Sequence, residues 1–434
     1  MLDLLHPKRF VDCDGVSRRQ FMRVGSLGLG AMSLSTLLAA RAQARSSGAA
    51  VNNTSVVWLW LAGGATHVET FDPKMTAPSE YQSVTGEVAS AIKGVTIGGS
   101  LPKIAGVLDK MAIVRSFHHK NSGHGGGTHW LMTGYDNRSV DNGGVPSRPS
   151  MGAVVSRFRG ANHEKTGIPT YVGLGKIGSD GASFLGPASG PFSPGGNARQ
   201  EMTLRISDER LEDRRHMLAA IDKLKSNVDA SGQLVGVDDF QQQAYNLLTG
   251  GATKAFDTAG EDPALVKRYG QGLGKQLLVA RRLCEAGAGF VTISYGGWDM
   301  HGNILNGMKQ RSPDLDNGVA TFIEDIHSRG LDKNILLVIT GEFGRTPKIN
   351  KNGGRDHWAP LSTLALAGGG LKMGQVIGES ADKVDVPKDN PKSPQDLMAT
   401  IFHVLGIPGD LQFRDHFGRP VYMLDKGKPM AELI

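Results

Sequence analysis

Five short, mostly apolar segments, each ended by glycine or by a polar loop, constrain the fold of this chain most strongly. Apolar runs without polar alternation are typical of strands buried on both faces of a parallel sheet. Segments with helical periodicity separate the five runs. The order of elements therefore predicts an α/β fold with a central, mostly parallel sheet and helices on both faces. The predicted strands are residues 56–62, 112–114, 289–294, 335–340 and 361–367.

Helical spacing of apolar residues predicts helices at 204–226, 238–249, 263–287, 314–329 and 393–405. In the last of them, Ser393 is the expected N-cap and Pro394 the first helical residue. Residues 137–196 are rich in Gly, Ser and Pro and have little periodicity, which predicts long surface loops or an inserted lobe. A chain of 434 residues with 39% apolar residues can form one large domain or two smaller ones. The element order favours a single domain over residues 45–434.

The first 44 residues have the features of an export signal. Arg18 and Arg19 precede a weakly apolar stretch, and Ala42-Gln43-Ala44 has the small-x-small form of a cleavage site. An N-terminal membrane helix is the alternative, but three glycines interrupt the stretch. We therefore expect the twin-arginine translocase as a partner, a periplasmic or extracellular location, and no stable membrane span after cleavage. Without this segment, 42 Lys and Arg face 39 Asp and Glu, so the charge favours no nucleic-acid partner.

Histidine and acidic residues follow several of the predicted strands, where the carboxyl ends of strands place ligand sites in α/β sheets. Oxygen and imidazole donors at this density suit a divalent metal such as zinc, manganese or calcium. Each residue alone is more typical of an ordinary structural hydrogen bond, but several such groups together indicate a shared site. The candidate metal ligands are His67, Asp72, Asp299, His301, Glu342, Asp356 and His357.

Arg345 lies beside these groups in the sequence, and a guanidinium is the usual bidentate partner of an oxyanion. An ion pair with a carboxylate is the alternative role for this arginine. A substrate with a phosphate or sulfate group would use it.

These motifs resemble a bacterial protein family known as domain of unknown function 1501, which is itself related to the alkaline phosphatase and sulfatase superfamily. The resemblance covers residues 50–410. It rests on Phe71 to Lys74, His124 to Gly134, Ala280 to Leu283, Trp298 to His301, Gly341 to Pro347 and Gly354 to Trp358.

The resemblance implies an alkaline phosphatase-like sheet with up to two metal ions per chain. Glu342 stands where superfamily hydrolases carry a metal-binding Asp-His pair, with Phe343 in the histidine position. His357 matches the last metal-binding histidine, and Asp299 with His301 matches the middle group. The aspartate expected after the first strand is replaced by Gly63-Gly64, which leaves His67 or Asp72 to substitute for it.

The nucleophile is less well defined by the resemblance. The Cys-x-Pro-Ser-Arg motif of sulfatases is missing from the sequence, and an ungapped match of the Leu-x-Thr-Gly segment puts the cysteine position on His124. His124 is therefore a candidate phosphoryl acceptor or metal ligand, and Ser122 or Thr128 could supply a hydroxyl nucleophile.

Three functions follow from these observations. The first is an exported, metal-dependent hydrolase of phosphate or sulfate esters, acting on small-molecule or polysaccharide substrates. The second is a non-catalytic exported binding protein that keeps the fold with a degenerate site. The third is another exported, metal-dependent enzyme that acts on carbohydrate.

Overall fold

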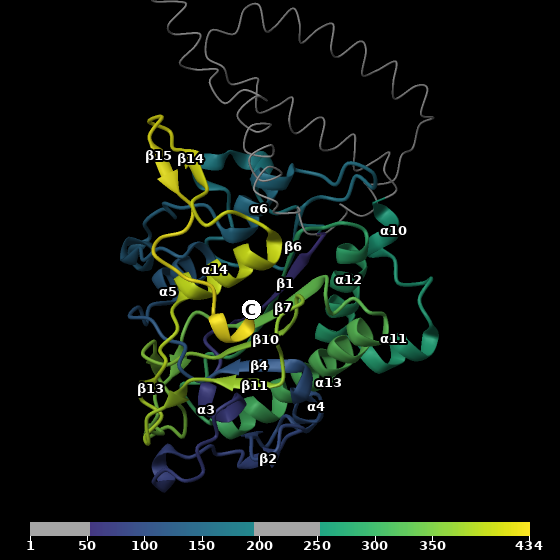
Figure 1. Ribbon diagram of the computed structural model, residues 1–434. Coiled ribbons are helices and arrows are strands. Elements are labelled where there is room, and N and C mark those ends of the chain that lie inside the picture. The colour runs from purple at the N-terminus through teal and green to yellow at the C-terminus, as the bar shows by residue number, and fades with distance from the viewer. Residues whose placement is uncertain (1–52, 195–251) are drawn as a thin grey trace, which may run out of the picture.

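The computed structural model describes residues 53–194 and 252–434 (Figure 1). The predicted export signal and the predicted helices at 204–226 and 238–249 lie outside the described residues. The sheet, the site and the contacts below all belong to the described ranges.

A seven-stranded sheet forms the centre of the molecule, in the order β11-β4-β10-β7-β1-β6-β5. β1 pairs in parallel with β6 on one side and with β7 on the other, and only β10 runs against its two neighbours. The prediction of an α/β fold with a mostly parallel sheet is therefore confirmed. The strands are β1 Ser55–Ala62, β4 Met111–Val114, β5 Tyr171–Leu174, β6 Phe290–Gly296, β7 Ile335–Thr340, β10 Leu364–Gly368 and β11 Gln375–Ile377.

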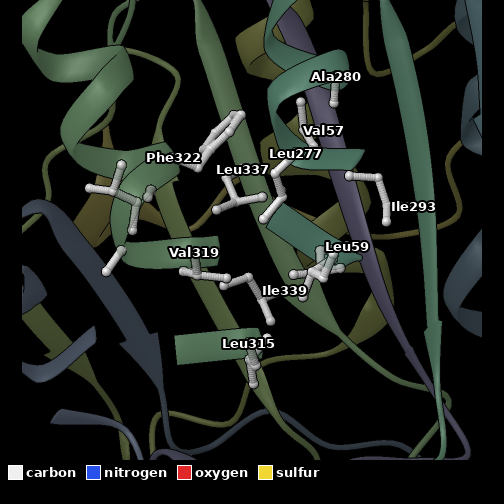
Figure 2. Packing of buried hydrophobic residues seen from close by; sticks show 14 of the residues in the cluster. Val57, Leu59, Leu277, Ala280, Ile293, Leu315, Val319, Phe322, Leu337 and Ile339 are labelled. Carbon is white, nitrogen blue, oxygen red and sulfur yellow. The ribbon is translucent and has the colours of Figure 1, made fainter. Parts of the chain in front are cut away.

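Helices cover both faces of the sheet, and two separate hydrophobic clusters result. Val57 and Leu59 of β1 point toward the cluster formed with α12 and α13, as Figure 2 shows. Val56 and Trp58 alternate with them and join the cluster on the opposite face, where α6 and α14 pack. Because every residue from Val56 to Leu61 is at most 2% exposed, β1 has no polar face, which explains its uninterrupted apolar sequence.

The helices differ greatly in length, and none of those in the described ranges combines the length and apolar character needed to cross a membrane. They are α3 His67–Thr70, α4 Pro102–Gly106, α5 His124–Thr133, α6 Met151–Arg159, α10 Thr253–Phe256, α11 Pro263–Tyr269, α12 Leu273–Glu285, α13 Ile304–Ser328 and α14 Pro394–Leu405. Four two-stranded ribbons complete the fold: β2 Glu87–Ala89 with β3 Thr96–Gly98, β8 Gly344–Arg345 with β9 His357–Trp358, β12 Glu379–Ser380 with β13 Pro387–Asp389, and β14 Gln412–Arg414 with β15 Pro420–Tyr422.

Two predicted helix boundaries are wrong. The helix predicted at 263–287 is split into α11 and α12, because Gly270 and Gly272 adopt positive φ angles of 75° and 56° that end one helix and precede the next. The helix predicted at 314–329 begins earlier, since the side chain of Asn303 caps α13 and Pro313 is accommodated inside it. The expected N-cap at Ser393 is confirmed, and Asp396 completes a capping box.

The region 137–196 contains more regular structure than its composition predicts. It supplies α6 and the edge strand β5, which pairs in parallel with β6. β5 is only four residues long and includes Gly173, so no apolar run marks it in the sequence. The short strand β11 also lacks such a run.

A buried charge network joins α11, α12 and α13 beside the sheet. The Arg281 side chain is 1% exposed, and its guanidinium pairs with Glu285, with Glu261 at 2.6 Å and with Asp325 at 3.1 Å. The hydroxyl of Tyr269 donates to the Asp325 carboxylate at 2.9 Å. The Ala280 to Leu283 motif therefore serves to hold the helix layer together.

We expect Arg281→Ala to lower the free energy of unfolding by about 3–5 kcal/mol, because the change removes the buried cation that Glu261 and Asp325 share. Urea denaturation followed by circular dichroism measures this loss. The control is Arg268→Ala, since the Arg268–Glu324 pair has side-chain exposures of 53% and 49% and should be worth about 1 kcal/mol or less. Equal losses in the two variants would contradict a structural role for the network.

Candidate metal centre

Several of the predicted site residues meet at the carboxyl ends of β6 and β7, on either side of the end of β1. Asp299 and His301 follow β6, and Glu342 follows β7. His124 is the first residue of α5, and His357 opens the short strand β9. This is the edge of a parallel sheet where ligands are expected to bind.

The carboxylate of Asp299 is the meeting point of these side chains. Its Oδ1 lies 3.0 Å from Nε2 of His301 and 3.1 Å from Nε2 of His357. The two Nε2 atoms are themselves 3.0 Å apart, so the three atoms form a nearly equilateral triangle. The side chains of Asp299 and His301 are 45% and 46% exposed, so the triangle is open to solvent.

The outer ring nitrogens of both histidines face hydrogen-bond acceptors. Nδ1 of His301 donates to Oδ1 of Asp356 at 2.7 Å, and Nδ1 of His357 donates to the carbonyl oxygen of Ser122 at 3.0 Å. A carboxylate and a carbonyl can only accept, which assigns the ring proton to Nδ1 in each neutral imidazole. Both Nε2 atoms therefore turn a lone pair toward Asp299.

His124 stands at the other oxygen of Asp299, with Nε2 3.5 Å from Oδ2. Its Nδ1 donates to Oε1 of Glu342 at 2.7 Å, and the same oxygen accepts from the backbone N–H of Gly63 at 2.9 Å. The hydrogen bond to Glu342 raises the pKa of His124 above its usual value. Glu342 is therefore placed to orient His124 and to stabilise its protonated form.

Two groups of the triangle have shifted pKa values. Burial lowers the pKa of His357, which favours its neutral form. Burial alone would raise the pKa of Asp299, but the hydrogen bond and charge of Arg345 lower it to about 2. When both imidazoles are neutral, one negative charge and two lone pairs converge, an arrangement that a bound cation would stabilise. His124 lies within reach of the same centre, because ligand atoms of His124, Asp299 and His357 all lie within 4.8 Å of one another.

Arg345 supports Asp299 from inside the protein. Its side chain is fully buried, and its Nη2 donates to Oδ1 of Asp299 at 2.5 Å. The other contacts go to backbone carbonyls, with Nε donating to Gly64 at 2.8 Å and Nη1 to Arg355 at 3.1 Å. Nη2 also donates to the carbonyl of Gly63. Every nitrogen of the guanidinium is committed within the protein.

Glycines allow the loops around the site to approach one another. A Cβ on Gly63, which has a φ of 108°, would lie 2.5 Å from the backbone nitrogen of Asp299. On Gly354, a Cβ would lie 2.2 Å from the carbonyl carbon of His301. Gly63 therefore allows the Asp299 loop to lie directly against the end of β1, at the point where the resemblance implies an aspartate.

Asn350, which was not among the predicted site residues, ties two parts of the site together. Its Nδ2 donates to the carbonyl of His301 at 3.0 Å and lies 3.3 Å from both carboxylate oxygens of Asp356. Its Oδ1 accepts from the N–H groups of Asn352 and Gly354 at 2.9 and 3.0 Å. The turn-forming Asn350 to Gly354 segment was the only available signal.

His67 and Asp72, two predicted metal ligands, make their contacts elsewhere. Nε2 of the buried His67 lies 3.1 Å from the carbonyl oxygen of Val384. The buried Asp72 accepts from the hydroxyl of Ser380 at 2.5 Å and lies 3.5 Å from Nε of Arg115. Both side chains have structural partners in these positions.

The two hydroxyl candidates differ in their surroundings. The hydroxyl of Thr128 donates to the carbonyl of His124 at 2.6 Å, a bond within α5 that occupies its proton. The exposed Ser122 accepts from the N–H of Ala359 at 3.0 Å through its hydroxyl. Of the three predicted nucleophiles, His124 is the one whose side chain faces Asp299 directly.

We expect Gly63→Ala to destabilise the protein by about 3 kcal/mol, because the new Cβ would displace the Asp299 loop. Gly86→Ala is the matched control: Gly86 also has a positive φ, of 68°, but a Cβ there meets nothing within 4 Å. Backbone strain alone should cost the control about 1 kcal/mol. Urea unfolding of both variants measures the difference, and equal losses would show that the loop does not need this close approach.

Comparisons with solved structures find similar chains among sulfatases and phosphatases. The PsFucS1 sulfatase from Pseudoalteromonas sp. is 12% identical with a TM-score of 0.40, over 87% of this chain and 72% of that one. The phosphonate monoester hydrolase SpPMH from Silicibacter pomeroyi is 12% identical with a TM-score of 0.36, over 87% and 76%. The alkaline phosphatase from the Antarctic bacterium TAB5 is 14% identical with a TM-score of 0.35, over 82% and 99%. At these values the likeness assigns no activity.

No curated protein sequence matches the chain. The family model described as "Protein of unknown function (DUF1501)" matches residues 53–434, which include every site residue described above. The match confirms the family predicted from the motifs, and the chain belongs to the DUF1501 family.

Proposed function

We propose that this chain is an exported, metal-dependent hydrolase of phosphate or sulfate esters. The observation that carries the proposal is the triangle of Asp299 Oδ1, His301 Nε2 and His357 Nε2, with sides of 3.0–3.1 Å. In the neutral imidazoles, the outer nitrogens donate to other groups and the inner nitrogens offer lone pairs. Three protein ligands with an open side are typical of catalytic metal sites.

The donor set favours zinc or manganese over calcium. Two imidazoles and one carboxylate suit these ions, whereas calcium takes six to eight oxygen ligands. Asp356 and the Ser122 carbonyl support the ligands by holding the outer nitrogens of His301 and His357. In this proposal Asp299, His301 and His357 hold the ion, and Asp356 positions one of them.

A metal at this position would act as a Lewis acid on an ester oxygen. His124 supplies a base beside it, since its Nε2 can take a proton from an attacking water or hydroxyl. Glu342 holds the ring through the 2.7 Å bond to Nδ1 and stabilises the imidazolium that forms. The raised pKa of His124 supports this role, because it makes the imidazole a stronger base.

Export through the twin-arginine translocase rests on the Arg18-Arg19 motif and the segment that follows it. This route carries folded chains, which agrees with a protein that acquires its metal before crossing. We propose a periplasmic or extracellular location, where small-molecule or polysaccharide esters are the expected substrates.

A non-catalytic binding protein is the second candidate, and one observation favours it. Every nitrogen of Arg345 is already bonded within the protein, so this arginine is not free to bind a substrate oxyanion as predicted. A binding protein needs no such group. Hydrolysis therefore has to be measured directly.

We expect Asp299→Asn to remove both metal and activity. The change keeps the shape of the side chain but takes away the charge at the centre of the triangle. Elemental analysis of chelator-free protein measures the metal, and a panel of phosphate and sulfate esters measures hydrolysis. The positioning variant Asp356→Asn should weaken metal binding by about 10–100-fold.

The control is Asp109→Asn, which changes an exposed aspartate paired with Lys110 and should leave metal content and hydrolysis unchanged. Bound metal without hydrolysis of any ester in the wild type would favour the binding protein. Metal content that survives Asp299→Asn would contradict the proposed ligands.

A further inference from the structure

We infer that the centre holds a single metal ion, because the guanidinium of Arg345 occupies the position beside Asp299 that a second cation would need. This inference rests on the proposed metal-dependent function. It departs from the two ions per chain that the family resemblance implies.

Arg345 behaves as a fixed cation. Its side chain is fully buried, and it lies against four oxygen atoms: Oδ1 of Asp299 and the carbonyl oxygens of Gly63, Gly64 and Arg355. A metal ion at this place would seek the same kind of oxygen cage. The guanidinium already satisfies these oxygens and cannot lose its proton in a protein.

On the side of Arg345, the carboxylate of Asp299 has no lone pair available for a second cation. Its Oδ1 accepts from Arg345 at 2.5 Å and faces His301 and His357 with the rest of its lone-pair density. A second ion bridging at Oδ1 would have to displace the guanidinium. Oδ2 lies 3.5 Å from Nε2 of His124.

The apolar ring of Phe343 packs beside the proposed metal centre, where it offers no ligand atom to a second ion. Its ring centroid lies 4.3 Å from that of His357 and 5.1 Å from that of His124. A Cβ added to Gly64 would meet the Phe343 ring at 2.4 Å, so the ring is pressed against the end of β1. The resemblance implies a histidine at this position and an aspartate in place of Gly63-Gly64, and the chain has neither ligand.

Three further acidic side chains have partners of their own. Glu69, with no exposed side-chain surface, pairs with Nη2 of Arg355 at 2.8 Å. Asp72 lies 3.5 Å from Arg115, and Oε1 of Glu342 accepts from His124 and Gly63. Oε2 of Glu342 is buried with no hydrogen-bond partner. One unpaired oxygen beside a buried guanidinium does not make a second metal site.

The number of bound ions tests the inference. The full chain is stripped with chelator, dialysed, and titrated with Zn²⁺ or Mn²⁺, and bound ions are counted by elemental analysis and native mass spectrometry. We expect saturation at one ion per chain. Two ions would overturn the inference while leaving the metal-dependent function intact, whereas no bound ion would overturn the proposed centre itself.

The variant Phe343→His tests whether the guanidinium of Arg345 or the ring of Phe343 excludes a second metal ion. The variant restores an imidazole at the position where the resemblance implies one and keeps Arg345 in place. We expect one ion per chain, as in the wild type, because the guanidinium still holds the position. A gain to two ions would show that Arg345 does not exclude a second cation and would overturn the inference.

Discussion

The ion pair between the buried Arg345 and the partly exposed Asp299 is the interaction on which the site depends. Through one guanidinium it joins the end of β1, at the carbonyls of Gly63 and Gly64, to the loop after β6 and to the loop before β9. A charge with no exposed side-chain surface survives only when its partners are well placed, so these loops are held in one arrangement. The same pair keeps Asp299 ionised, with a pKa of about 2, ready to meet a cation on its exposed side.

The parallel sheet explains why residues so distant in sequence come together. β1 lies between β6 and β7, so the loops that follow these three strands emerge at one edge. The glycine turn after β1 takes up almost no volume, and the backbone of Asp299 fills the space that a side chain on Gly63 would need. Replacement of an expected aspartate by glycine is therefore a change in packing as well as the loss of a ligand.

The sequence predicts the central strands well, because a strand that is buried on both faces consists mostly of apolar residues. The runs from Val56 to Ala62 in β1 and from Ile335 to Ile339 in β7 contain no polar residue. The short strand β5 has no apolar run and was not predicted. Helices α11 and α12 were predicted as one helix, which the structure divides at Gly270 and Gly272. Residue type also predicted that Asp299, His301 and His357 would share a site. Residue type could not show that Arg345 bonds to groups within the protein or that Glu342 orients His124, because these roles depend on which residues lie beside them in the fold.

The central claim is that the triangle of Asp299, His301 and His357 is a metal site, and the position of the metal tests it most directly. A crystal of the zinc- or manganese-loaded protein, measured on either side of the metal absorption edge, locates the ion by anomalous scattering. The account predicts a peak within bonding distance of Oδ1 of Asp299 and Nε2 of His301 and His357, on the side away from Arg345. A peak bonded to other residues, or no peak beside Asp299 in metal-saturated crystals, would contradict it.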